Sequence, residues 1–332
     1  MSPPLLKRPP ISTAPPSAGI PSRRIALAVF DPDLLTEAVR DAGFEHLQLH
    51  PGPFEGELVR AEVGGLTIDR GSYSQTLLVR GGFASTRVTI GFLLSDREPG
   101  CINGIRSRAH DLVVFPEGGE LDYVLPAATE WCAVQLDRDA LLAAGIPEES
   151  IGRMSVVSPR AGQHARLAQL MRAAVEGLVG SQEQRRFRDA LIEELHQSLD
   201  PRRNQSRNPN FYERADVLRR FERLVDEQGP ERCSIAELAR SLGVARRTLE
   251  LAFHDYLGLS PARYIAVLRL NAMRRELLRA SADNLRVADL AERYGIAHLG
   301  RFAGEFRKMF GEHPRDTLQR RFHHAETGVD PV

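Results

Sequence analysis

A short stretch near residue 250 has the side-chain chemistry of a surface that reads DNA bases. Arginine can donate two hydrogen bonds to guanine, glutamate can accept one from the cytosine amino group, and leucine can contact the thymine methyl group. Arg247, Glu250 and Leu251 supply these chemistries in one predicted helix. The residues that we expect to contact DNA here are Arg246, Arg247, Thr248, Glu250, Leu251 and His254. The alternative is that the arginines only neutralise phosphates and that Glu250 lies on a solvated face.

A second stretch, 52 or 53 residues further along, offers mainly phosphate-binding chemistry. Its expected DNA contacts are His298, Arg301, Arg307 and Lys308. Gly300 and Gly304 stand where base-reading side chains would be expected. Glycine has no side chain for reading bases, but it allows a helix to approach the DNA backbone closely. We therefore expect the first stretch to provide more of the base specificity and the second to provide anchoring.

The residues around the first stretch predict two short helices joined by a tight turn. Ser234 and Glu237 have the spacing of a capping box at the start of the first helix, and Gly243 marks its end. The second helix runs from about Ala245 to Gly258, and Ala245 has no side-chain oxygen with which to cap it. Two short helices around a glycine-containing turn are the pattern of a helix-turn-helix.

The same pattern recurs after a spacer helix that begins at Pro261. Gly295 and Gly311 follow Gly243 and Gly258 by 52 and 53 residues, respectively. A single copy would also fit an ordinary helical hairpin. Internal duplication is a much more specific signal than one copy, so the sequence predicts two helix-turn-helix motifs.

The duplicated segment resembles the AraC/XylS family of transcriptional regulators over about residues 211–322. The resemblance rests on IAELARSLGVARRTLELAFHDYLGLSPARYI and on VADLAERYGIAHLGRFAGEFRKMFGEHPRDTL, and HLGRFAGEFRKMFGEHP is most similar to the ethanolamine-regulator branch. It implies two recognition helices in successive major-groove segments of double-stranded DNA. It also implies an N-terminal domain that binds a small-molecule effector, forms a homodimer, or both. RNA polymerase is an expected partner if the protein is an activator.

Charge and composition agree with a DNA-binding segment in an otherwise ordinary globular chain. The 332 residues carry 44 basic and 44 acidic side chains, but residues 211–322 hold 21 Arg and Lys against 16 Asp and Glu. This modest basic excess suits contact with phosphates. No apolar run reaches the ~20 residues of a membrane span, and the first residues lack a signal-peptide core. We expect a cytoplasmic protein with no membrane partner.

Changes in periodicity divide the chain into five parts. We expect a disordered tail (1–22), a sensor or dimerisation domain (23–199), a linker (200–210), a DNA-binding domain (211–322) and a second tail (323–332). After a helix at 33–41, short alternating segments up to residue 136 predict strands, and 164–179 and 183–199 predict amphipathic helices. These helices could cover the sheet or form a dimer interface.

The predicted fold class is α+β. It combines an N-terminal cupin-like β-barrel that carries helices with an all-α C-terminal domain. The barrel is expected from the resemblance and from RAHDLVVFPEGGELDYVLP at residues 108–126, which has a strand, a Pro/Gly turn and a second strand.

The N-terminal half lacks the side-chain clusters of an enzyme. His46, His50 and His110 are scattered, without a His-x-His pair, so we expect neither a metal nor a cofactor. No nucleophile triad, phosphate-binding glycine loop or carboxylate pair stands out, and we expect no catalytic activity.

Two alternatives come from other functional classes. The first is a metal-dependent cupin enzyme fused to a DNA-binding domain. The second is a methyl-accepting DNA-repair sensor, which needs a reactive cysteine in a zinc cluster. The three cysteines, Cys101, Cys132 and Cys233, are too far apart in the sequence for zinc-ligand or disulfide spacing.

Overall fold

The computed structural model describes residues 23–29, 32, 43–94, 100–160, 162–199, 209–279, 286–296 and 298–319. The expected tails, the helix at 33–41 and most of the linker at 200–210 lie outside these residues. Helix α6 begins at Pro209, within the last residues of the expected linker.

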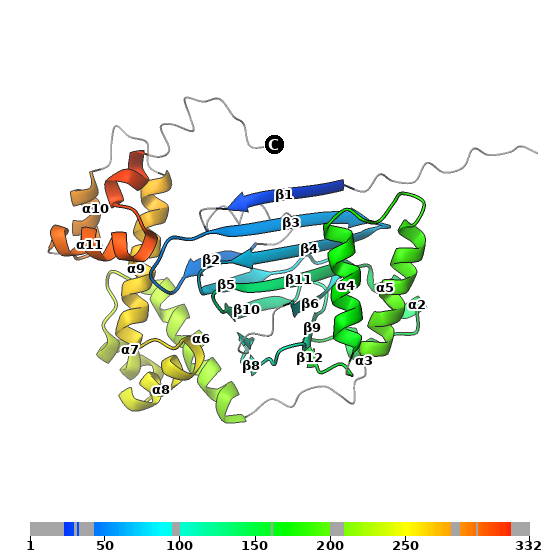
Figure 1. Cartoon of the computed structure of the whole chain (residues 1–332). Coiled ribbons are helices and arrows are strands. Elements are labelled where there is room, and N and C mark those ends of the chain that lie inside the picture. Colours follow the sequence, from blue (N-terminus) through cyan, green and yellow to red (C-terminus); the bar gives the residue numbers. More distant parts are fainter. Residues whose placement is uncertain are drawn as a thin grey trace, which may run out of the picture.

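Two antiparallel sheets form the N-terminal domain (Figure 1). The larger sheet contains, in spatial order, β1 (Arg23–Val29), β3 (Gly56–Val63), β4 (Leu66–Tyr73), β11 (Thr129–Leu136), β6 (Val88–Leu93), β9 (Leu112–Phe115) and β12 (Ser155–Val157). The smaller sheet contains β2 (Glu45–Gln48), β5 (Leu77–Gly82), β10 (Glu120–Leu125), β7 (Cys101–Ile102) and β8 (Ile105–Arg106).

The expected cupin-like barrel is not confirmed, although the mixed α+β class is. The described strands form two open sheets, with β1 and β12 at the edges of one and β2 and β8 at the edges of the other. The apolar alternation that predicted the strands shows that one face of each strand is buried. It does not show which strands pair, and pairing decides whether a sheet closes.

Four helices follow β11, with β12 between the second and the third: α2 (Arg138–Ala143), α3 (Glu148–Ile151), α4 (Gln163–Val175) and α5 (Gln184–Ser198). Leu167 and Met171 of α4 are fully buried in one apolar core with Val59 of β3 and Ile68 of β4. Of the two roles expected for the amphipathic helices, covering the sheet is therefore confirmed for α4. Dimerisation stays a prediction.

The C-terminal helices are α6 (Pro209–Gln228), α7 (Ile235–Leu242), α8 (Arg246–Leu257), α9 (Pro261–Arg279), α10 (Val287–Arg293) and α11 (Leu299–Phe310). Figure 1 shows them gathered at one end of the sheets, with α9 between the pair α7–α8 and the pair α10–α11. The aromatic rings of Phe221, Phe253 and Tyr264 join α6, α8 and α9. The ring of Phe253 lies 4.7 Å from that of Phe221 and 5.3 Å from that of Tyr264, centroid to centroid.

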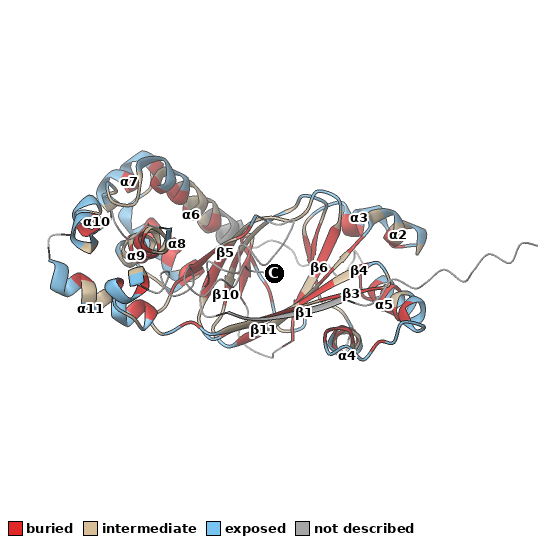
Figure 2. Ribbon diagram, turned by 90° about the horizontal axis from the view of Figure 1, so that it is seen from above, coloured by how far each residue is buried: buried red, intermediate tan, exposed pale blue. Residues whose placement is uncertain are grey.

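The smaller sheet separates two hydrophobic cores. Along β5, Leu77 and Val79 belong to the core between the sheets, whereas Leu78 belongs to the core of the C-terminal helices. Along β10, Tyr123 faces the first core and Val124 packs against the second. This two-residue alternation is the normal period of a strand. The sheet is therefore shared by both domains, and Figure 2 shows β5 and β10 as a mixture of mainly buried and intermediate residues.

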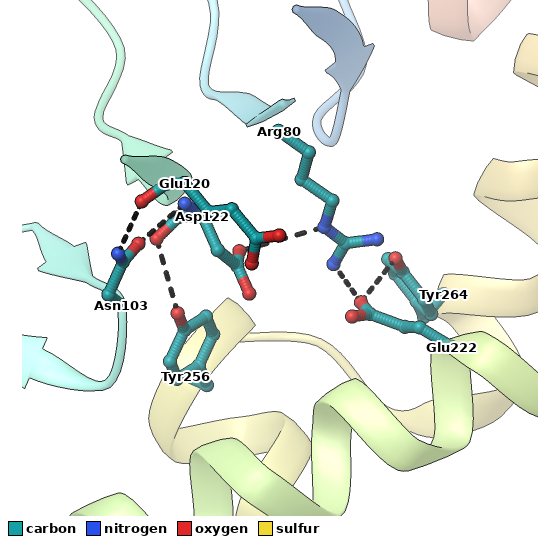
Figure 3. Close-up of polar contacts among 7 residues, drawn as sticks. All are labelled: Arg80, Asn103, Glu120, Asp122, Glu222, Tyr256 and Tyr264. Carbon is teal, nitrogen blue, oxygen red and sulfur yellow. Dashed lines mark hydrogen bonds and ion pairs between the residues drawn. The ribbon is translucent and has the colours of Figure 1, made fainter. Parts of the chain in front are cut away.

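A polar cluster lies on the face of the smaller sheet that is turned toward the helices (Figure 3). Arg80 of β5 forms an ion pair with Glu222 of α6, and its Nε lies 3.6 Å from a carboxylate oxygen of Asp122 in β10. The hydroxyl of Tyr264 donates a hydrogen bond of 2.7 Å to Glu222. The hydroxyl of Tyr256 donates a long one, 3.5 Å, to the backbone carbonyl of Asp122.

The edge strand β2 contacts the second half of the helical domain. The Asn271 side chain of α9 accepts from the Gln48 backbone N–H (3.3 Å) and donates to the Gln48 carbonyl (3.1 Å). The Gln48 side chain donates to the carbonyl of Met309, in α11, at 2.7 Å. Asn271 thus pairs with backbone groups that a sheet edge would otherwise leave open.

We predict that the interface between the two domains weakens as Glu222 ionises. The pKa of this carboxyl is raised from 4.5 to about 7, because the effect of burial, aided by the charge of Asp122, outweighs the opposite effect of Arg80. Because the pKa is higher in the folded state, the contribution to stability is complete below pH 4.5 and is lost as the pH rises through about 7. Urea unfolding at several pH values measures this effect.

The matched variant is Glu222→Gln, which keeps a hydrogen-bonding side chain but cannot ionise. Across the same pH window, the free energy of unfolding of the unmodified protein should fall relative to that of the variant. If the two proteins show parallel pH profiles, titration of Glu222 does not control the interface.

Candidate nucleic-acid interface

The first helix-turn-helix has the expected helices and turn. Helix α7 ends at Gly243, whose φ of 66° is left-handed and favours glycine, and α8 begins at Arg246. Ser234 is the N-cap residue of α7, but its side chain makes no capping hydrogen bond, so this part of the expected capping box is wrong. Ala245 makes no side-chain capping bond either, as its methyl group dictates.

Helix α8 has one buried face and one exposed face. Leu249, Ala252 and Phe253 are fully buried against the other helices. The exposed residues include all six that the sequence singled out: Arg246, Arg247, Thr248, Glu250, Leu251 and His254. The neighbouring N-terminal domain does not cover them. The structure therefore brings these side chains together on a surface that is open to a large partner.

Charges on the exposed face of α8 are partly paired with one another. The Nε of Arg246 lies 2.9 Å from a carboxylate oxygen of Glu250, one helical turn away. Arg247 makes no ion pair within the described part of the chain. An exposed pair of this kind is weak, so Glu250 can exchange its partner at low cost. Arg247 and Glu250 line a surface hollow of about 390 Å³ together with Leu251 and His254.

The second helix-turn-helix repeats the arrangement with fewer reading side chains. Gly295, with a φ of 67°, lies in the turn after α10, and α11 follows His298. His298, Arg301, Arg307 and Lys308 are exposed, as expected. Arg301 forms an ion pair of 3.0 Å with Glu305 on the same helix.

Two exposed glycines give α11 a flat surface. A methyl group built at Gly300 or Gly304 would meet no atom within 4 Å. Neither glycine is therefore required by packing inside the protein. The space beside them is open, so the sugar-phosphate backbone of a nucleic acid could approach closely. The basic residues of α11 lie on the same short helix.

Sequence reasoning missed the residues that join the two domains. Arg80 and Glu222 are 142 residues apart, and Gln48 and Asn271 are 223 apart. Contacts between such distant residues leave no local periodicity or motif. Strand β5 begins with three consecutive apolar residues at 77–79, which fits a strand buried on both faces, but the run does not show that helices cover the second face.

The described residues contain no group of three or more His, Cys, Asp or Glu side chains that could hold a metal ion. His46, in β2, belongs to no such group, and burial lowers its pKa to about 4. The Nδ1 atom of His110 lies 3.0 Å from that of His164. All three cysteines are free, and burial raises the pKa of Cys101 to about 12. Such a thiol is a poor nucleophile, in contrast to the reactive cysteine of the methyl-accepting alternative.

None of the described helices combines the length and the apolar character that crossing a membrane requires.

Comparisons with known proteins match the C-terminal part of the chain. A helix-turn-helix domain family matches residues 238–320. The "Probable thc operon regulatory protein" of Rhodococcus erythropolis is 38% identical over 86 residues, which are 26% of each chain. The "XylDLEGF operon transcriptional activator 2" of Pseudomonas putida is 32% identical over 108 residues, which are 32% of this chain and 69% of that protein.

The chain spans only about a quarter to a third of the length of most of these curated relatives. Among solved structures, a probable AraC family regulator from Rhodopseudomonas palustris is 33% identical, with a TM-score of 0.30, over 32% of this chain and 97% of that one. The AraC-like activator CuxR is 15% identical, with a TM-score of 0.42, over 76% and 96%.

We predict that Gly304→Ala stabilises the protein. The residue lies inside α11 with open space around it, so alanine should raise the free energy of unfolding by about 0.5–1 kcal/mol through its higher helix propensity. Gly243→Ala is the matched control. The same added methyl meets no atom there, but the φ of 66° should make it destabilising by roughly 1–2 kcal/mol. Urea unfolding measures the free energy of unfolding of both variants. A change of the same sign in both would contradict the different backbone roles assigned to Gly304 and Gly243.

Proposed function

Because the chain belongs to the AraC family of helix-turn-helix regulators, we propose that it is a sequence-specific DNA-binding regulator of transcription. The observation that carries the proposal is the duplicated motif around α9, with the outer faces of α8 and α11 both exposed. A duplex presents successive major-groove segments on one side, and two such helices on one rigid spacer suit that repeat.

We assign different tasks to the two recognition helices. Helix α8 presents Arg247 without an ion-pair partner in the described residues, together with exposed Thr248 and Leu251, which can contact base edges. Helix α11 presents basic side chains beside two glycines and suits phosphate contacts. Base specificity is therefore proposed for the first motif and anchoring for the second.

The N-terminal domain is proposed to sense a small-molecule effector, and a homodimer is proposed as the form that binds a promoter. RNA polymerase is proposed as a further partner if the protein is an activator. The name of the Pseudomonas putida relative calls that protein a transcriptional activator. The similarity of the second motif to the ethanolamine-regulator branch remains a further proposal. Such a regulator would act in the cytoplasm, where bacterial DNA is transcribed.

The function is tested by titrating the full-length protein against duplex DNA from its own promoter region. We predict tight binding at low salt that weakens steeply as salt rises, because each phosphate contact releases counterions and adds about 0.9 to the slope of log affinity against log salt. A scrambled duplex of equal length is the control and should bind more weakly. Absence of promoter binding at low salt would refute the proposed function.

A second test separates the two recognition helices. Arg247→Ala should cost roughly 1–3 kcal/mol at one base position and relax preference there. Arg301→Ala should weaken binding about equally for all promoter variants and reduce the salt slope by about one unit. The measurement is affinity across a panel of single-base promoter changes.

Arg166→Ala is the control for these variants. Arg166 is similarly exposed and forms a 2.9 Å pair with Glu194, but it lies on α4 of the N-terminal domain. It should leave DNA affinity unchanged. If Arg301→Ala changes base preference while Arg247→Ala lowers all affinities equally, the two helices have the opposite tasks.

A further inference from the structure

A cavity of about 120 Å³ lies between the two sheets of the N-terminal domain. Most of its lining is apolar, and its aromatic residues are Phe44, Tyr73, Phe83, Phe92, Phe115, Tyr123 and Trp131. An apolar protein cavity of ~150 Å³ is known to hold one benzene molecule. The cavity therefore has about the volume and the surroundings for one aromatic ring.

Three polar atoms of lining residues have no hydrogen-bond partner among the described residues, and one of them is Nε1 of Trp131. The other two are Nδ1 of His46 and the hydroxyl of Tyr123, whose residues are 5% and 8% exposed. A buried polar atom without a partner costs free energy that a bound molecule could recover. Burial lowers the pKa of His46 to about 4, so its ring is neutral near pH 7 and can either donate or accept a hydrogen bond.

The charges in the lining do not favour a charged ligand. Asp69 already accepts hydrogen bonds of 2.7 and 2.9 Å from Arg60, and Asp111 accepts one from the Ser158 hydroxyl. Among the described lining residues the cation is Arg108, which is exposed. An anion inside would lack a buried positive partner, and burying an unpaired charge is costly.

We propose that this cavity binds a small, uncharged aromatic compound with one hydroxyl or similar polar group, which contacts His46 and Tyr123. This ligand is the effector of the regulator, an assignment that rests on the proposed function. The ring fills the space between the aromatic side chains. The polar group pairs with the buried polar atoms of these two residues, which otherwise lack partners.

The position of the cavity explains how a bound ligand would affect the helical domain. His46 follows Glu45, which forms an ion pair with Arg275 of α9. Tyr123 follows Asp122, which lies in the polar cluster around Arg80. Because neighbouring residues of a strand face opposite sides, a ligand that displaces either cavity residue also displaces an interface residue.

The test uses the fluorescence of Trp131, the only tryptophan of the chain, which lines the cavity. The full-length protein is titrated with benzyl alcohol, toluene, benzoate and ethanolamine, without DNA. Benzyl alcohol should give a saturable change and bind about 25-fold more tightly than toluene, the effect of two added hydrogen bonds of about fivefold each. Benzoate should bind more weakly than benzyl alcohol, and ethanolamine should cause no change.

Tyr123→Phe removes the hydroxyl and keeps the ring. It should weaken benzyl alcohol about fivefold and leave toluene unchanged, which a merely structural effect would not do. Tyr294→Phe is the matched control, because it removes a hydroxyl bonded to Glu276 in the helical domain. It should change neither affinity.

Three results would overturn the ligand class: no saturable change with either neutral aromatic probe, binding of benzoate or ethanolamine as tight as that of benzyl alcohol, or equal weakening of toluene and benzyl alcohol by Tyr123→Phe. These results would leave the DNA-binding function intact, since the titration contains no DNA. If the protein instead fails to bind its promoter, the proposed regulator function and the effector role of the ligand are refuted, but the proposed ligand site is not.

Discussion

The smaller sheet has to satisfy two hydrophobic cores at once, and the arrangement of the rest of the molecule depends on this. Its strands send alternate side chains to opposite faces, so Leu77 and Val79 serve the core between the sheets while Leu78 serves the core of the helices. A slip of one residue in β5 would exchange these sets and place Arg80 in the apolar interior. The strand register thus determines where the helical domain attaches.

Apolar contacts and polar contacts contribute differently to this attachment. Leu47, Leu49 and Leu78 join the core of the helices and provide the hydrophobic driving force. The cluster around Arg80 contributes less net stability, because burying charges costs much of what their attraction returns. Two carboxylates, Asp122 and Glu222, share this one guanidinium. The cluster links α6 to β5 and β10 through these polar contacts.

The parts of the structure that sequence predicted are those with local causes. The helix-turn-helix duplication was visible because Gly243 and Gly258 both adopt a left-handed conformation, each with a φ of 66°, and the glycine signal recurs at Gly295 and Gly311. The main strands between residues 58 and 136 were visible through alternation. The two open sheets, the short strands β2 and β12 and the domain interface were not. They depend on pairings between distant residues, for which one sequence holds no periodic signal.

The contacts of the smaller sheet suggest how a ligand bound to the N-terminal domain would affect DNA binding. In the described residues the N-terminal domain does not cover the outer faces of α8 and α11. Different strands instead contact different motifs: β10 reaches Tyr256 of α8, whereas β2 reaches Met309 of α11. A small shift of β2 relative to β10 would therefore change the orientation of one recognition helix relative to the other. Two helices that must enter successive major-groove segments are sensitive to that orientation, because binding requires both to fit the groove spacing together.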